Sequence, residues 1–386
     1  MQALRDKNVP KYLCKIVASY FTDRILKYDT KNGPREYDIT GGVQQGCVFG
    51  PLLWNIMYDG LLRLKLPRSV KLVAYADDVA VVIVAKHLDE INHMSGIDFK
   101  QVNWWMNTVN LQLAHHKTEA VLITSRKKLE TITLEVGEQR IISQPFIRYL
   151  GVMIDARLSF KQQVEHDSAK ASVVRTSLTR LMPNVGGPKQ SRRQLLSSVV
   201  TSILTHGISI WAEALEIQEA WRKAGPVYRL SALRVPSAFR IISQEAVYVI
   251  SGTLPLRVLA AERRALYHRK RSTALSGEEL SIEERQNSIS QWQLQWDAAV
   301  KGRWTHRLIP RIDFWINRNY GEPKARKIEM ILNQNIQPET IVDAILSSEA
   351  SWNATSTFVA EVLIELRSIE RRRANDANWM KRKITS

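Results

Sequence analysis

Apolar residues recur along this chain with two different periods. Helical spacing runs through "VPKYLCKIVASYF" (9–21) and "QGCVFGPLLWNIMYDGLLRL" (45–64) and predicts two amphipathic helices. Short β-branched runs, "VKLVAYA" (70–76), "VAVVIVA" (79–85) and "TEAVLIT" (118–124), predict strands. The pattern favours an α+β region at the start of the chain.

The later sequence is typical of helices. Residues 1–155 form the mixed α+β region, and residues 156–275 are mostly helical, with "RRQLLSSVVTSILTHGISIWAEAL" as the clearest amphipathic segment and "PNVGGPKQ" (183–190) as the break before it. Residues 276–386 are also expected to be helical, and they are rich in charge and Trp. We therefore predict three regions.

Charge and cysteine content narrow the class of protein. The 386 residues carry 55 Lys and Arg against 38 Asp and Glu, a net charge of +17, which favours a polyanionic partner such as nucleic acid. No apolar run reaches the roughly 18 residues that a membrane span needs, so we expect no membrane partner. Cys14 and Cys47 are too few for a disulfide framework or a cysteine zinc site. These features fit an intracellular protein of the nucleus or cytoplasm.

Two adjacent acids interrupt the apolar runs, in "YADDVAVVI" (75–83). The runs on either side have strand length, so Asp77 and Asp78 are predicted to form the tip of a tight hairpin. Carboxylates projecting from such a tip can share divalent cations with a third ligand, as two-metal phosphoryl transfer requires. A solvated turn is the alternative, since Asp favours turns on its own account.

Three further stretches are ambiguous when each is taken alone. The loop before the second helix contains Gly46 and Gly50, which permit close backbone approach to a ligand or simply begin a helix. Lys117 precedes a predicted strand and could reach a phosphate or lie in solvent. "IRYLGVMIDARLSF" (147–160) is predicted to be a hairpin that packs on the core.

Taken in order, these stretches resemble the reverse transcriptases of non-LTR (LINE-like) retrotransposons, most closely those of the insect type. The family pattern G-x-P-Q-G-S-x-L-G-P-L-L, [YF]-A-D-D, K-T-E and Y-L-G-V matches "GVQQGCVFGPLL", "YADD", "KTE" and "YLGV". The resemblance extends weakly to "GRWTHRLIP" (302–310).

The resemblance implies an incomplete right-hand polymerase palm over residues 1–155, a helical thumb over 156–275 and a helical region over 276–386. Asp77 and Asp78 would be catalytic and would hold Mg²⁺, with Mn²⁺ as an alternative, while Lys117 would be a general acid for the pyrophosphate leaving group. The partners would be an RNA template, a DNA primer and dNTPs; nothing in the sequence fixes the oligomeric state. Residues implied to contact nucleotide, template or primer are Gln45, Gly46, Tyr75, Tyr149, Leu150 and Gly151.

The chain departs from the family pattern in ways that predict low activity. In the family, a strand carrying another metal-binding Asp precedes the helix that resembles "MQALRDKNVPKYL", and Met1 lies inside that helix. The fingers, the endonuclease and the zinc knuckle are also expected to be missing, and Gln44, Cys47 and Phe49 replace Pro, Ser and Leu of the family loop. Two carboxylates alone would hold metal weakly, so we expect this chain to be inactive by itself.

A basic stretch offers another function. Residues 221–275 hold eleven Lys and Arg against two Glu, and helices there could lie along a phosphate backbone or present a solvated charged face. The alternatives to a polymerase are therefore a non-enzymatic nucleic-acid-binding protein and a helical interaction module. In "NWWMN", the Trp residues are predicted to be core, because Trp105 is in step with Val102 and Val109 on one helical face, and stacking of Trp104 on bases is the alternative. Candidate phosphate contacts are Arg222, Lys223, Arg263, Arg264, Arg269 and Lys270.

Overall fold

A computed structural model describes residues 1–317, except 45, 129, 137–138 and 185–186, together with residue 349. The chain divides into two compact units, Met1–Leu150 and Gly151–Ser386. The division into three regions at 155 and 275 stays a prediction. The expectation of a helical region over 276–386 falls largely on residues outside those described.

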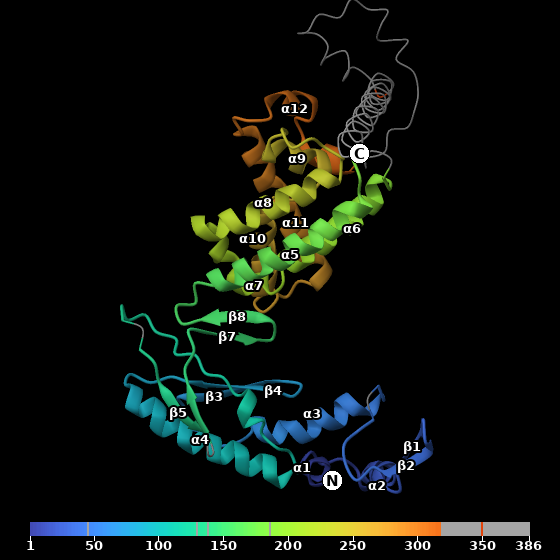
Figure 1. The fold of residues 1–386 in the computed structure, drawn as a ribbon, viewed down its shortest axis with the longest axis vertical. Helices are drawn as coiled ribbons and strands as arrows, with labels where there is room; N and C mark the ends of the chain where they lie inside the picture. The colour runs from blue at the N-terminus through green and yellow to red at the C-terminus, as the bar shows by residue number, and fades with distance from the viewer. Residues whose placement is uncertain (45, 129, 137–138, 185–186, 318–348, 350–386) are drawn as a thin grey trace, which may run out of the picture. The chain divides into compact units, whose positions relative to one another are not determined.

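The first unit combines helices with small antiparallel sheets (Figure 1), so the predicted α+β class is confirmed. Its β1/β2, β3/β4 and β5/β6 pairs are each two-stranded and antiparallel. The helices are α1 (Gln2–Asp6), α2 (Lys11–Phe21), α3 (Phe49–Leu62) and α4 (Leu88–Thr108). The strands are β1 (Ile25–Thr30), β2 (Gly33–Asp38), β3 (Val70–Tyr75), β4 (Asp78–Ile83), β5 (Thr133–Val136), β6 (Gln139–Ile142) and β7 (Phe146–Tyr149).

Alternation of side chains gives the β3/β4 hairpin one face that packs on helices. Leu72, Ala74 and Val79 lie on that face, as a period of two requires, and they contact the apolar cluster between α3 and α4. The buried members of this cluster are Tyr58, Leu61, Val102, Trp105 and Met106. Helices α3 and α4 thus support the hairpin from one side.

The second unit begins with strand β8 (Val152–Asp155) and is otherwise helical over the described residues (Figure 1). Helix α5 packs against α6 and α8, and α10 packs against α7 and α11. The α-helices are α5 (Lys161–Leu181), α6 (Gln190–Leu204), α7 (Ile208–Trp211), α8 (Gln218–Arg234), α9 (Gln244–Ser251), α10 (Leu256–Arg269), α11 (Gly277–Asp297), α12 (Arg303–Leu308) and α13 (Ile312–Asn317), and η2 (Ala212–Glu216) is a 3₁₀ helix.

Large aromatic residues fill the core of this unit, and two of them donate hydrogen bonds to backbone carbonyls. The Tyr228 hydroxyl donates to the Leu254 carbonyl at 2.7 Å, and the Trp296 indole N–H donates to the Ile309 carbonyl at 2.9 Å. Such bonds let an aromatic side chain be buried without an unpaired donor. They also tie the links after α9 and α12 to the core.

Several predictions from periodicity are confirmed. Helices α2 and α3 and strands β3 and β4 form where the apolar spacing placed them. The stretch predicted to be a hairpin contains strands β7 and β8 with a turn at 150–151, and the predicted break lies between the end of α5 at Leu181 and the start of α6 at Gln190. Trp105 is buried as predicted, whereas the core position predicted for Trp104 is wrong, because its side chain is 65% exposed on the opposite side of the helix from Val102.

The predicted strand over 118–124 is wrong. Only an isolated parallel bridge joins Val121 to Gln144, so no hydrogen-bonded ladder holds this stretch extended within the described residues.

No single helix in the described residues is long and apolar enough to span a membrane. Two consecutive helical segments, Gln190–Leu204 and Ile208–Glu216, would be long and apolar enough only if they were counted as one bent span.

Candidate active site

Asp77 and Asp78 lie at the tip of the β3/β4 hairpin. Tyr75 pairs with Asp78, so Ala76 and Asp77 form the two-residue turn and Asp78 is the first residue of β4. The sequence analysis placed the two-residue turn at Asp77 and Asp78, which is wrong by one residue, because the turn lies one position earlier in the chain. The turn requires a positive φ, and Ala76 adopts it at 53° although it has a Cβ.

The tip is anchored to helix α3. The Trp54 indole N–H donates to the Ala76 carbonyl at 3.2 Å, across the turn that carries Asp77. The Trp54 ring stacks on Tyr58, with centroids 5.0 Å apart, and Tyr58 meets the edge of Trp105 at 5.9 Å. This aromatic chain fixes the strained turn relative to α3 and α4.

Both carboxylates are exposed, and neither makes a hydrogen bond or an ion pair within the described residues. Their negative charge nevertheless reaches the neighbouring phenols. Burial, followed by the charges of Asp77 and Asp78, raises the pKa of Tyr58, and burial followed by Asp78 raises the pKa of Tyr149. The Tyr149 hydroxyl is buried without a partner in the described structure. A cation bound at the tip would offset this local excess of negative charge.

The donor chemistry suits a hard divalent cation but supplies only part of a site. Two adjacent carboxylates with free oxygens are the ligands that Mg²⁺ and Mn²⁺ prefer. Among the described residues, no group of three His, Cys, Asp or Glu side chains gathers to hold a metal ion. Asp77 and Asp78 can therefore hold one side of a metal centre and leave its other positions open.

The other predicted site residues of this unit lie on different elements and differ in exposure. Lys117 ends the short 3₁₀ helix His115–Lys117 and is exposed. Tyr75 is 67% exposed and lies directly across the hairpin from Asp78. Gly46 has a φ of 85° and no atom within 4 Å of where a Cβ would stand, so its backbone is open to a ligand. Gln45 lies outside the described residues.

The "YLGV" stretch forms the link between β7 and β8. Leu150 (φ 47°) and Gly151 (φ 83°) both take positive φ, which type I′ turns require. A Cβ on Gly151 would lie 2.8 Å from Nε2 of His206, so glycine is required there for space as well as for conformation.

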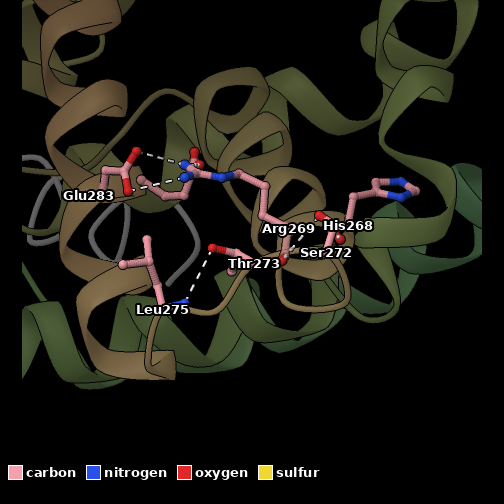
Figure 2. A network of polar contacts seen from close by, with 7 residues as sticks. His268, Arg269, Ser272, Thr273, Leu275 and Glu283 are labelled. Carbon is pink, nitrogen blue, oxygen red and sulfur yellow. Dashed lines mark hydrogen bonds and ion pairs between the residues drawn. The ribbon is translucent and has the colours of Figure 1, made fainter.

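Several basic residues predicted to contact phosphate are paired with acids on other helices. In Figure 2, the Arg269 guanidinium at the end of α10 bonds Glu283 of α11 at 2.9 Å. It also pairs with Glu284, and the two carboxylates raise the pKa of Arg269. A phosphate would have to compete with these carboxylates.

Of the other five candidate phosphate contacts, three have partners within the protein and two make no ion pair. Lys223 pairs with Glu165 at 3.2 Å, Arg264 pairs with Glu213, and Arg263 donates to the Thr205 carbonyl. The exposed Arg222 and Lys270 make no ion pair within the described ranges. The strongly positive balance of residues 221–275 is therefore partly neutralised by acids that lie outside that window.

Sequence reasoning missed the residues that hold the tip. Trp54 and Tyr58 are four residues apart on α3, so they share a helix face, and that aromatic pair was the available signal. The hydrogen bond from Trp54 to Ala76 is tertiary and has no local signature in the sequence.

Comparison with known proteins covers about three quarters of the chain. A family model described as reverse transcriptase (RNA-dependent DNA polymerase) matches residues 1–154, which include the acidic tip. The Pol polyprotein from the type-1 retrotransposable element R1 of Nasonia vitripennis is 24% identical over 305 residues, covering 74% of this chain and 90% of the relative. The putative 115 kDa protein in element R1DM of Drosophila melanogaster is 26% identical over 313 residues, covering 76% of this chain and 30% of the relative. No solved structure shows a significant match.

The α+β unit with its acidic hairpin and the match over residues 1–154 define the class, a reverse transcriptase. Relatives from R1 elements, similar over about three quarters of the chain, support an insect-type reverse transcriptase of a non-LTR retrotransposon. This family generally uses divalent metal ions, a nucleic-acid template and primer, and nucleotide substrates. The chain spans 90% of one curated relative and about a third of two others, from Bradysia coprophila and Drosophila melanogaster.

Proposed function

We propose that this chain carries part of an RNA-directed DNA polymerase site, with residues 1–155 as palm and residues 156–275 as thumb. The observation that carries the proposal is the pair of exposed, unneutralised carboxylates, Asp77 and Asp78, on a hairpin tip that α3 holds in place. That pair lies inside the residues matched by the reverse transcriptase family model.

Asp77 and Asp78 would hold Mg²⁺, or Mn²⁺, through their free oxygens. Bound divalent ions would activate the primer 3′-hydroxyl and neutralise the triphosphate. Tyr75, across the hairpin from Asp78, would contact the primer end. Lys117, exposed and without an ion pair in the described structure, would give a proton to the leaving pyrophosphate.

The nucleic acid would lie against open backbone and basic helices of the chain. The open backbone at Gly46 would approach the nucleotide or template base together with Gln45. The turn of Tyr149, Leu150 and Gly151 would support the primer strand. The basic helices of the second unit would contact the RNA template and DNA primer.

We also propose that the acidic pair needs a third acidic ligand from outside the described residues. No described side chain completes a group of three around the pair, and two-metal transfer depends on ligand geometry held within fractions of an ångström. Another chain would supply it. The isolated chain should therefore bind divalent metal weakly and extend a primer little.

Metal binding tests the site directly. Electron paramagnetic resonance of Mn²⁺ titrated into the chain should detect weak bound metal that Asp77→Asn with Asp78→Asn abolishes. The matched control is Asp89→Asn with Glu90→Gln, which removes an adjacent exposed acidic pair in the first turn of α4. Equal loss in both double variants would mean that Mn²⁺ binds by general surface charge, and the proposed site would be wrong.

A further inference from the structure

The link between α10 and α11 contains a serine that directly follows three basic residues. Arg269 is the last residue of α10, Lys270 and Arg271 come next, and Ser272 is exposed. Residues 270–276 lie between the two helices, so this serine is on a short surface loop (Figure 2). Exposed loops are the parts of a folded chain that modifying enzymes reach most easily.

Of the three hydroxyl groups in this loop, that of Ser272 is the least engaged. It reaches two backbone carbonyls at the end of α10 only at 3.4 and 3.5 Å. The Thr273 hydroxyl is half-buried and accepts the Leu275 N–H at 3.3 Å, as Figure 2 shows. The Ser276 side chain is occupied as the N-cap of α11, in a capping box. Ser272 is therefore the hydroxyl that a modifying enzyme can take without breaking a cap or a turn.

The arginine at the end of α10 joins this loop to α11. Its guanidinium bonds both carboxylate oxygens of Glu283, at 2.9 and 3.1 Å, and it also pairs with Glu284. Glu284 is only 7% exposed, and no other side chain bonds its carboxylate within the described residues. Arg269 thus neutralises two adjacent acids, one of them buried.

The basic residues before the serine form a recognition pattern. Protein kinases select substrates partly by charge, so a kinase with an acidic substrate groove would bind a basic segment that precedes the acceptor hydroxyl. Lys270 and Arg271 are exposed and make no ion pair in the part of the chain that the structure describes. The guanidinium of Arg271 lies 4.7 Å from the centroid of the Tyr267 ring, a contact that leaves its charge uncompensated.

We propose that Ser272 is a phosphorylation site for a serine/threonine kinase that recognises basic sequences, and that its phosphate takes Arg269 away from Glu283 and Glu284. The kinase transfers the γ-phosphoryl group of ATP: a bond forms between Oγ of Ser272 and the γ-phosphorus, and the bond from that phosphorus to the bridging oxygen breaks. ADP leaves, and the hydroxyl proton passes to the catalytic carboxylate of the kinase.

The phosphate can compete for Arg269 because of its charge and its position. Phosphoserine carries about −1.5 to −2 charge at pH 7 and three strong acceptor oxygens. Ser272 follows Arg269 by three residues, a spacing at which side chains at a helix end can meet. Loss of the arginine would leave Glu283 and the buried Glu284 as neighbouring charges without a cation, which is unfavourable. Phosphorylation would then loosen the start of α11, independently of the acidic tip.

The site is tested on the full chain with the catalytic subunit of cAMP-dependent protein kinase, which prefers basic sequences, and Mg·ATP. Mass spectrometry of the digested chain should locate phosphate on Ser272. Ser272→Ala should lose that phosphate, whereas the matched control Thr273→Val removes the neighbouring hydroxyl and should keep it. No phosphate on Ser272, or transfer to Thr273 in its place, would overturn the site.

Hydrogen exchange then tests the displacement of Arg269. Peptides from the first turns of α11 should exchange roughly two- to fivefold faster in the phosphorylated chain, the effect of losing a partly exposed ion pair. Glu283→Gln with Glu284→Gln keeps the basic sequence but removes the same pairs, so it should exchange faster without phosphate and gain little on phosphorylation. Unchanged exchange in the phosphorylated parent chain, or the same further acceleration in the double variant, would overturn the displacement.

Discussion

Two glycines on the helices beneath the acidic tip predict opposite effects of the same substitution. In Gly60→Ala on α3, the new Cβ would lie 2.9 Å from Nε1 of Trp105 and 3.4 Å from two ring carbons. Trp105 is buried against Tyr58, so its ring cannot simply swing away. In Gly96→Ala on α4, no atom lies within 4 Å of the new Cβ.

The magnitudes follow from helix propensity and packing. Both variants gain about 1 kcal/mol because Ala is a better helix former than Gly. Gly60→Ala also overfills a packed contact, which costs about 1–3 kcal/mol. Gly96→Ala should therefore stabilise the first unit, and Gly60→Ala should be neutral or destabilising, with the two variants about 1–3 kcal/mol apart.

Hydrogen exchange measured by mass spectrometry checks this locally, because it reports on peptides of α3 and α4 separately from the second unit. The protection factors of the two variants should differ by roughly five- to 150-fold for amides that exchange by opening of the unit. Equal stabilisation by both substitutions would refute the packing of α3 on Trp105, and with it the support described for the tip.

Three further predictions concern single side chains. Trp54→Phe keeps an aromatic side chain but removes the N–H that donates to the Ala76 carbonyl. The variant should destabilise the tip by about 0.5–1.5 kcal/mol, which hydrogen exchange would detect as faster exchange in β3 and β4. It should also weaken Mn²⁺ binding. Asp155→Ala should cost about 2–4 kcal/mol in urea unfolding, because its carboxylate accepts backbone N–H bonds from the turn before α5, the shortest 2.6 Å from Phe160. Asp98 is buried with both oxygens unpartnered in the described structure, and burial raises its pKa above the unfolded value of about 4. The native state then binds more protons, so stability falls as pH rises from about 4 to the raised pKa; Asp98→Asn should remove that fall and raise the melting temperature at pH 7.

Local periodicity predicted the elements that bury one face. Leu72, Ala74 and Val79 alternate with exposed positions, and so β3 and β4 were identified from sequence with little error. The turn was misplaced by one residue because Ala76 has no intrinsic preference for positive φ, and the pairing of Tyr75 with Asp78 imposes it. The stretch after Lys117 has strand-forming residues, but in the described structure it lacks a paired strand.

The basic surface shows a second limit of reasoning from sequence. Counting charge over residues 221–275 could not include Glu165, Glu213 and Glu283, which come from other parts of the chain and pair with Lys223, Arg264 and Arg269. Charge pairing is a tertiary property, so only the packing of helices distinguishes neutralised arginines from unpaired ones.

The central claim is that Asp77 and Asp78 are polymerase ligands that need a third acid. The most direct measurement is Mg²⁺-dependent extension of a DNA primer on an RNA template by the purified chain, beside the chain carrying Asp77→Asn and Asp78→Asn. The account predicts that the two proteins give the same background. Extension by the parent chain that the double variant loses would contradict it, because the purified chain would then complete the site by itself.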